Sequence, residues 1–264
     1  MKLNLSCQPQ PEGKEERENS ADLRHEGEIM KIMVINPNTS ASMTKHIREA
    51  LSIIKRPDTE LTVVCAERGP ETIDSAYHEY FAIPPTLDLV NQANREGYDA
   101  VIIAAFPDPG LVAAKEISEI PVIGIQESTL HMAAMLGARF SIITTLKQRI
   151  PSKREYVYAK GLEHFLASVR CLDQPTAEND AAPEKTKARV VEIARKAIEE
   201  DGAEVIILGC SGMAGYAPEI EAKLNAKVLD PTAVALKVAE AIVDLGLMHS
   251  KTGLFCTPPD NPFK

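Results

Sequence analysis

Residues 99–110 read Asp-Ala-Val-Ile-Ile-Ala-Ala-Phe-Pro-Asp-Pro-Gly, and residues 202–213 read Gly-Ala-Glu-Val-Ile-Ile-Leu-Gly-Cys-Ser-Gly-Met. Each stretch holds a short apolar run, which is typical of a strand buried on both faces of a parallel sheet. The small residues, Pro and Gly that follow predict a turn into a helix. In open α/β sheets, ligands bind at this carboxyl end of the strands. The second stretch has Cys210 there, and the first has Ala105.

Strand and helix signals alternate from Lys31 onward. Strands are predicted at residues 31–36, 61–65, 100–106, 122–125, 140–145, 167–171, 204–208 and 227–229. Helices are predicted from Ser40, after Pro84-Pro85, after the N-cap pair Asp108-Pro109, around 130–136, from a Ser152–Glu155 capping box, at 184–200, and from Asp230-Pro231 to Gly246; residues 173–183 are predicted to be a loop. This alternation predicts mostly parallel sheets with helices on both faces.

The two similar stretches begin about a hundred residues apart, which suggests two similar halves facing one another. The predicted fold class is therefore α/β, with two pseudo-symmetric Rossmann-like halves and an active-site cleft between them. We expect residues 30–125 and 231–264 to form the first half and residues 126–230 the second. Residues 1–29 are polar without an apolar period and are predicted to be a disordered tail.

Composition excludes several classes of protein. The net charge is -9 and no Lys/Arg cluster with interleaved aromatic residues is present, which argues against nucleic-acid binding. No apolar run reaches the ~18 residues that a membrane span needs. The five cysteines are odd in number, never form Cys-x-x-Cys and follow no signal peptide, so we expect free thiols in the cytoplasm.

Cys210 is the main candidate for chemistry. Gly209 and Gly212 on either side allow the backbone a close approach. A cysteine at the start of a helix has its thiolate stabilised by the free N–H groups and the helix dipole. The alternative is a buried structural cysteine, which is common.

Neutral polar residues occupy the other predicted strand ends. The turn after the first strand holds Asn36, Asn38 and Thr39, and the strand at 140–145 ends in Thr144 and Thr145. These side chains are suited to orient the carbonyls or ring nitrogens of a ligand. Helix capping and β propensity are the alternative explanations.

Three further polar residues have structural explanations. Asp108 is expected to cap a helix, and Glu127 is expected to complement a helix dipole. His131 lies in an apolar helix, where a packed core residue is expected. The histidines form no cluster with metal-ligand spacing, and no phosphate-binding glycine loop is present, so neither a metal nor a nucleotide cofactor is expected.

Several spaced motifs together resemble the hydantoin racemases, which lie with the allantoin racemases in the aspartate/glutamate racemase superfamily. They are Val34-Ile-Asn-Pro-Asn-Thr-Ser40, Phe106-Pro-Asp-Pro-Gly-Leu111, Ile120-Pro-Val-Ile-Gly-Ile-Gln-Glu127, His131-Met-Ala and Leu208-Gly-Cys-Ser-Gly-Met213. The resemblance extends from about Met30 to the Pro-rich C-terminal segment and implies a homo-oligomeric, cofactor-independent isomerase.

In such a racemase, two cysteines face opposite sides of a carbon next to a carbonyl. One removes a proton and the other delivers one, which inverts the centre through a planar enolate. Cys210 matches the second cysteine, and Ala105 stands at the position of the first. The expected substrate is a small amide or imide such as a 5-substituted hydantoin or allantoin, bound by Asn36, Asn38, Thr39, Phe106, Thr144, Thr145, Ser211, Gly212 and Met213.

Ala105 leaves three interpretations open. It is an engineered replacement for cysteine, or the mark of a natural single-cysteine decarboxylase or isomerase, or the mark of a binding protein without turnover. For an enzyme with Cys210 as its only thiol in the cleft, the sequence predicts proton exchange from one face with racemisation slow or absent. Racemase activity is then expected to be gained in Ala105→Cys.

Overall fold

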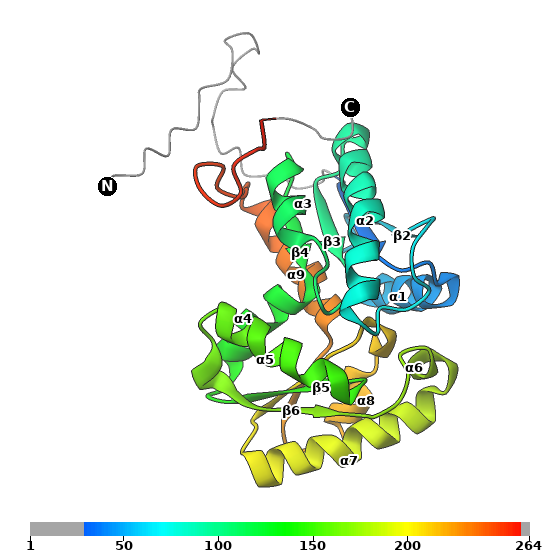
Figure 1. Cartoon of the computed structure of the whole chain (residues 1–264), viewed down its shortest axis with the longest axis vertical. Helices are drawn as coiled ribbons and strands as arrows, with labels where there is room; N and C mark the ends of the chain where they lie inside the picture. Colours follow the sequence, from blue (N-terminus) through cyan, green and yellow to red (C-terminus); the bar gives the residue numbers. More distant parts are fainter. Residues whose placement is uncertain (1–28, 260–264) are drawn as a thin grey trace.

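The computed structural model describes residues 29–259, which form two four-stranded sheets whose neighbouring strands are all parallel (Figure 1). The first sheet has the order β2-β1-β3-β4 and comprises β1 (Met30–Asn36), β2 (Thr59–Cys65), β3 (Ala100–Ile103) and β4 (Val122–Gly124). The second has the order β6-β5-β7-β8 and comprises β5 (Phe140–Thr144), β6 (Leu166–Cys171), β7 (Val205–Leu208) and β8 (Lys227–Leu229). The predicted α/β class is confirmed.

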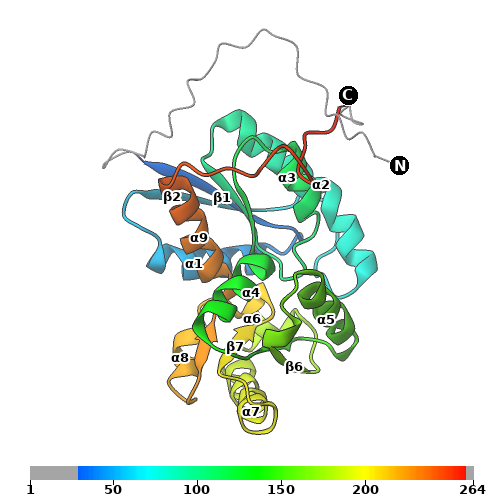
Figure 2. The same cartoon turned by 90° about the vertical axis from the view of Figure 1, so that its left-hand side faces the viewer.

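Helices cover both faces of each sheet. They are α1 (Ala41–Ile54), α2 (Ala76–Glu96), α3 (Leu111–Ile117), α4 (Ile125–Leu136), α5 (Ile150–Ala159), α6 (Glu178–Ala181), α7 (Pro183–Asp201), α8 (Ala217–Glu221) and α9 (Pro231–Asp244), with short 3₁₀ turns η1 (Lys147–Arg149), η2 (Glu163–Phe165) and η3 (Ser211–Met213). Figure 2 shows α1 and α9 on one face of the first sheet, with α2 and α3 on the other. No helix within residues 29–259 is long and apolar enough to cross a membrane.

The alternation of side chains along β1 explains this layering. Ile32 and Val34 belong to the core cluster that α1 and α9 complete, and Met33 and Ile35 belong to the cluster completed by α2 and α3. All four side chains are buried. A strand with apolar residues on both faces is stable only when both faces are covered, as in an α/β fold.

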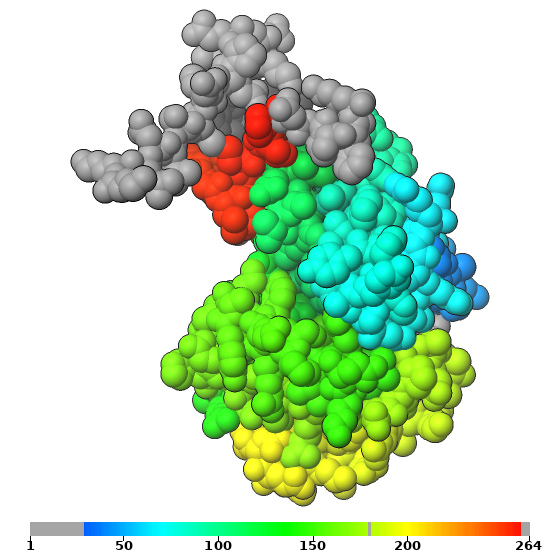
Figure 3. Space-filling model, viewed as in Figure 1, coloured from blue at the N-terminus to red at the C-terminus, as the bar shows by residue number. Residues whose placement is uncertain are grey.

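The two sheets share part of their core. Phe140 and Ile142 of β5 lie in the same apolar cluster as Ile32 of β1, and α4 contributes Leu130 to it. The space-filling view shows the resulting two lobes, one carrying the first sheet and one, in green and yellow, carrying the second (Figure 3). The lobes are therefore packed on one another and not merely tethered.

The α2 helix begins earlier than predicted. It starts at Ala76, with the Ser75 side chain accepting the N–H of His78, and passes through Pro84 and Pro85. Proline removes a helical hydrogen bond, which led to the prediction of a break. Burial of Val90 and of other apolar residues of the helix against the first sheet offsets that loss.

Other predicted boundaries are also wrong by a few residues. The capping box predicted at Ser152 does not form, because α5 starts at Ile150 and the Ser152 hydroxyl donates back to the Arg149 carbonyl at 3.0 Å. The strand predicted at 100–106 ends at Ile103, and the loop predicted at 173–183 contains α6.

The assignment of segments to two halves stays a prediction. α9 packs against β1, β3 and β4 of the first sheet. The tail predicted at residues 1–29 lies, apart from Ile29, outside the described residues.

Candidate active site

A pocket lies where the carboxyl ends of strands from both sheets meet. Segments that follow β1, β3, β5 and β7 contribute to its lining. Of the residues predicted to form the site, the lining includes Asn38, Ala105, Phe106, Thr144, Thr145, Cys210 and Ser211. The carboxyl end of parallel strands is the expected ligand site of such a fold.

Ala105 and Cys210 occupy equivalent places in the two sheets. Ala105 lies two residues beyond the end of β3, and Cys210 lies two residues beyond the end of β7. β3 and β7 are each third in the strand order of their sheets. Both residues are buried and both line the pocket, so the repeat in the sequence places one residue from each sheet at one site.

The backbone around Cys210 fixes the position of its thiol. The N–H of Gly209 donates to the Ile143 carbonyl at 2.8 Å, and a Cβ on Gly209 would lie 2.8 Å from that same oxygen. Only glycine therefore allows this approach of β7 to β5. The N–H of Gly212 donates to Cys210 Sγ at 3.4 Å, so the sulfur is held at the start of the turn η3.

Two asparagines form one rigid unit beside the pocket. The Asn36 amide donates to Asn38 Oδ1 at 2.8 Å, and the Ser40 N–H donates to the same oxygen at 2.9 Å. Asn38 Nδ2 lies 3.3 Å from Met43 Sδ. Asn38 lines the pocket, whereas Asn36 lies behind it, fully buried, and holds Asn38 in place.

The lining does not include every predicted binding residue. Thr39 hydrogen-bonds through its N–H to the Pro70 carbonyl, and Met213 is packed in the core of the second sheet. Gly212 donates its N–H to the Cys210 sulfur. Thr39 and Met213 therefore have structural roles. Neither residue lines the pocket, so no contact there supports their predicted roles in substrate binding.

Asp108 caps a helix other than the one predicted. Its Oδ1 accepts the Gln126 N–H at 2.9 Å and its Oδ2 accepts the Glu127 N–H at 2.7 Å, so it caps α4. The Tyr156 hydroxyl donates to Oδ2 at 3.1 Å. Burial raises the pKa of Asp108 to about 7 although these hydrogen bonds oppose the shift. The helix that directly follows Asp108, α3, begins after Gly110 and has no side-chain cap.

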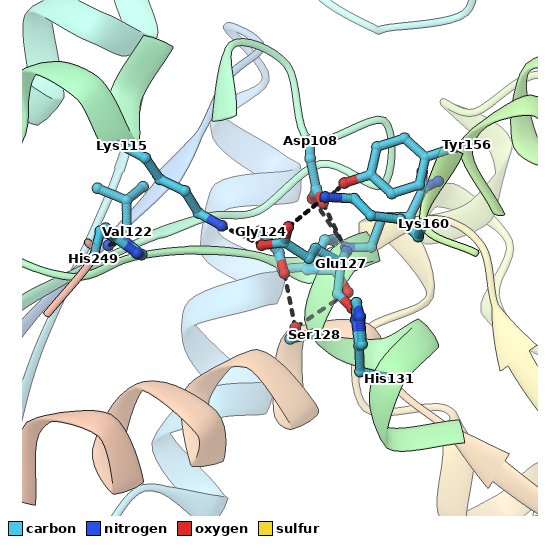
Figure 4. Close-up of polar contacts among 12 residues, drawn as sticks. Asp108, Lys115, Val122, Gly124, Glu127, Ser128, His131, Tyr156, Lys160 and His249 are labelled. Carbon is cyan, nitrogen blue, oxygen red and sulfur yellow. Dashed lines mark hydrogen bonds and ion pairs between the residues drawn. The ribbon is translucent and has the colours of Figure 1, made fainter. Parts of the chain in front are cut away.

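Glu127 is part of an ion-pair cluster next to Asp108 (Figure 4). Its carboxylate pairs with Lys115 and Lys160. Burial alone would raise the pKa of Glu127, but hydrogen bonds from the two ammonium groups outweigh it and hold the pKa below its ordinary value. The prediction that His131 is a core residue is wrong: it is exposed, with Nδ1 2.7 Å from the Glu127 carbonyl oxygen.

Two cations in the lining were missed by sequence reasoning. Arg149 pairs with Glu79 of α2 at 2.7 Å and so joins the two lobes beside the pocket. Lys153 of α5 is 4% exposed, with Nζ 3.3 Å from Gln126 Oε1 and 4.9 Å from the centroid of the Phe106 ring. Burial, and next the charge of Arg149, lower the pKa of Lys153 to about 7.

A signal for Lys153 exists in the sequence. Ile150, Lys153 and Val157 follow one another at helical spacings of three and four, which puts the lysine on the apolar face of α5. A helix start at Ser152, as the capping box predicted, obscures this periodicity. Within residues 29–259, no group of three or more His, Cys, Asp or Glu residues is placed to hold a metal ion.

Comparison with known proteins yields one family. The family model described as Asp/Glu/Hydantoin racemase matches residues 32–239. A hydantoin racemase of Pseudomonas sp. (strain NS671) is 39% identical over 229 residues, covering 87% of this chain and 92% of that protein. The allantoin racemase from Klebsiella pneumoniae has a TM-score of 0.85 at 36% identity, covering 88% of this chain and 95% of the other. The allantoin racemase from Pseudomonas fluorescens has a TM-score of 0.84 at 34% identity, covering 88% and 98%.

Proposed function

This chain belongs to the Asp/Glu/hydantoin racemase family, and from that membership we propose that it moves a proton at a carbon next to a carbonyl, with Cys210 as the proton-transferring group. The observation that carries the proposal is the buried Cys210 thiol at the carboxyl end of β7, in a pocket shared by both sheets. The proposed substrate is a 5-substituted hydantoin or allantoin, in keeping with the names of the relatives.

The neutral polar groups of the pocket support an amide or imide ring as substrate. Asn38, Thr144 and Thr145 offer amide and hydroxyl groups that both donate and accept hydrogen bonds. The carbonyls and N–H groups of a hydantoin ring need both kinds of partner. When the α-proton leaves, negative charge develops on the neighbouring carbonyl oxygen, and a hydroxyl donor close to it stabilises that charge.

The thiolate of Cys210 is the proposed base. It takes the α-proton of the bound ring and becomes a thiol, and the ring becomes a planar enolate. Return of a solvent-derived proton from the same sulfur restores the original enantiomer, now exchanged. The reaction needs no cofactor, because the thiol and the adjacent carbonyl supply the chemistry. Assembly into a homo-oligomer is part of the proposal, and light scattering of the purified chain tests it.

The experiment that tests this function is proton NMR in D₂O. Each pure enantiomer of a 5-substituted hydantoin, and of allantoin, is incubated with the unmodified chain and with Cys210→Ser. We expect the enantiomer whose α-proton faces Cys210 to lose that signal with the unmodified chain and to keep it with Cys210→Ser, because a hydroxyl is far less acidic than a thiol. Cys171→Ser, in the edge strand β6 outside the pocket lining, is the matched control and keeps the exchange.

Two outcomes count against the proposal. Exchange of both enantiomers that persists in Cys210→Ser shows that Cys210 is not a base of the reaction. Tight binding of the ring without any exchange shows a binding protein without turnover, the interpretation that Ala105 left open.

A decarboxylase is the second candidate, because Lys153 and Arg149 put two cations in the lining. Cations at a pocket are suited to bind a carboxylate. The pairing of Arg149 with Glu79 leaves it less available for that task. Release of CO₂ from a substituted malonate, with no exchange on hydantoins, would favour this candidate over the racemase.

A further inference from the structure

Lys153 is a buried cation that the reaction described so far does not use. It lies on α5, and its side chain points into the pocket that Cys210 also lines. Among residues 29–259, it forms no ion pair with a carboxylate, and its polar partner is the neutral amide oxygen of Gln126 at 3.3 Å. A buried lysine is normally paired with a carboxylate, since desolvation of an ammonium group is costly. This one is therefore in an unusual setting for a structural lysine.

The Lys153 amine lies next to the tip of the first sheet. Lys153 Nζ lies 4.9 Å from the centroid of the Phe106 ring, and Phe106 directly follows Ala105 at the tip of the first sheet. Cys210 stands at the tip of β7 in the second sheet. The amine thus lies beside the residue that follows Ala105, a position without an ionisable group, although Lys153 itself belongs to the second lobe.

We propose that Lys153 is the second proton-transferring group of this site and serves the face of the substrate carbon that Cys210 does not reach. This inference rests on the proposed function of Cys210. With Lys153 in this role, the unmodified chain is a racemase. The one-sided exchange predicted from the sequence is then expected in variants that lack the lysine amine.

The proton transfers balance within the pair. In one direction the Cys210 thiolate takes the α-proton and the Lys153 ammonium gives a proton to the other face of the enolate. The enzyme is left with a thiol and a neutral amine, and the ring is inverted. In the other direction the amine takes the proton and the thiol gives one, which restores thiolate and ammonium. No co-reactant is needed, since the pair holds one exchangeable proton before and after each turnover and a second only while the enolate exists.

The charges around Lys153 suit this exchange. Arg149, one turn before it, disfavours the ammonium form, and Glu79 of α2, Asp108 after β3 and Cys210 after β7 favour it. With burial, the balance brings the pKa of Lys153 to about 7, so both of its forms are populated near neutral pH. An acid or base of this pKa is the most effective kind at neutral pH.

The test compares Lys153→Met with a matched control. Lys187→Met removes a lysine that is also buried and lies 5.2 Å from an aromatic centroid, that of Tyr216, but pairs with Glu219 and does not line the pocket. Racemisation of pure hydantoin enantiomers is followed by polarimetry and α-proton exchange by NMR in D₂O. We expect Lys153→Met to lose racemisation by about 10²–10⁴-fold while one enantiomer still exchanges. Lys187→Met keeps both reactions.

A rescue and a pH profile separate chemistry from structure. Adding Ala105→Cys to Lys153→Met is expected to restore racemisation, because it returns an ionisable group to the same side of the pocket. In the unmodified chain, the rate of racemisation plotted against pH is expected to be bell-shaped, with one limb near the Lys153 pKa of about 7. The pH profile is expected to be the same for both enantiomers, because the equilibrium constant between them is one. The rescued double variant moves that limb.

Each contrary result has one meaning. Exchange from a single face by the unmodified chain, or undiminished racemisation in Lys153→Met, overturns the role of Lys153 and leaves Cys210 in place. If Lys153→Met loses exchange on both faces and adding Ala105→Cys does not rescue it, the lysine is needed for folding, and its proposed role in proton transfer is overturned too. Cys210→Ser is expected to exchange only the enantiomer that Lys153→Met no longer exchanges, so exchange of both enantiomers by Cys210→Ser refutes the proposed function itself, and absence of all exchange in the unmodified chain refutes both.

Discussion

The carboxylate of Asp108 accepts the backbone N–H of Gln126, 18 residues further along the chain, and so joins the end of β3 to the start of α4. The same carboxylate receives the hydroxyl of Tyr156 from α5. One buried acid therefore ties together a strand of the first sheet and two helices that face the second sheet. Its ionisation and the space around it lead to the first two predictions.

Replacing Asp108 with Asn is expected to remove one component of the pH dependence of stability. The pKa of Asp108 is about 7 in the folded chain and 3.8 in the unfolded reference, so its contribution is fully present below pH 3.8 and is lost as the pH rises to about 7. Urea unfolding at several pH values measures this as a falling free energy of unfolding. Asp108→Asn flattens that fall, and Asp88→Asn on the exposed side of α2 leaves it intact. An identical slope in Asp108→Asn would contradict the prediction.

Gly124→Ala is expected to destabilise the chain by about 1–3 kcal/mol. A Cβ on Gly124 would lie 2.4 Å from Asp108 Oδ2 and 2.6 Å from the Leu111 side chain, so the cap of α4 must shift. Gly253→Ala is the control, because no atom lies within 4 Å of its Cβ position. Thermal unfolding of both variants gives the comparison, and equal midpoints would show that the cap relaxes freely.

Glu79→Gln is expected to weaken the contact between the lobes at the pocket. Arg149 is 10% exposed and Glu79 28%, so loss of the acid leaves a largely buried guanidinium without its carboxylate. We expect a loss of about 2 kcal/mol in the free energy of unfolding and a raised KM. Asp88→Asn breaks an exposed pair, Arg68 at 71% and Asp88 at 65%, and is expected to cost less than about 0.5 kcal/mol. Equal effects in the two variants would count against a special role for the Arg149 pair.

Ala105→Cys is expected to raise the racemisation rate of the unmodified chain by about tenfold or more. Its Cβ lies in the lining of the pocket at the place equivalent to Cys210, so a thiol there faces the other side of the same space. Initial rates by polarimetry measure the change. A rate that stays the same or falls would mean that this position no longer faces the reacting carbon.

The strands were predictable because their short, wholly apolar runs fit a buried strand of a parallel sheet. The run from Ala100 to Ile103 is apolar at every position, and each of its side chains is buried. Such a run needs cover on both faces, which fixes a parallel sheet between helices. The pocket was predictable for the same reason, since Asn38, Thr144 and Cys210 follow directly on strands of this kind.

Lys153 and the true task of Asp108 depend on contacts between segments far apart in the chain. Local sequence shows Asp108 just before a helix and makes it the cap of that helix, whereas its φ of 48° turns the carboxylate toward α4. Lys153 stands beside Arg154 in a charged segment that is typical of an exposed helix. The spacing of Lys153 from Ile150 distinguishes the two only when the true start of α5 is known, and the packing of α5 against Phe106 then places Lys153 in the pocket.

The return of α9 to the first sheet has a consequence for synthesis on the ribosome. Leu236 and Ala239 of α9 complete the core cluster that covers the β1 residues Ile32 and Val34. Chains emerge N-terminus first, so this face of the first sheet, which α1 covers in part, is fully covered only when α9 has been made. The second sheet, which lies wholly within residues 140–229, has all its strands before that moment. The first sheet is therefore completed after the second, and part of its apolar face stays exposed on the nascent chain until α9 emerges.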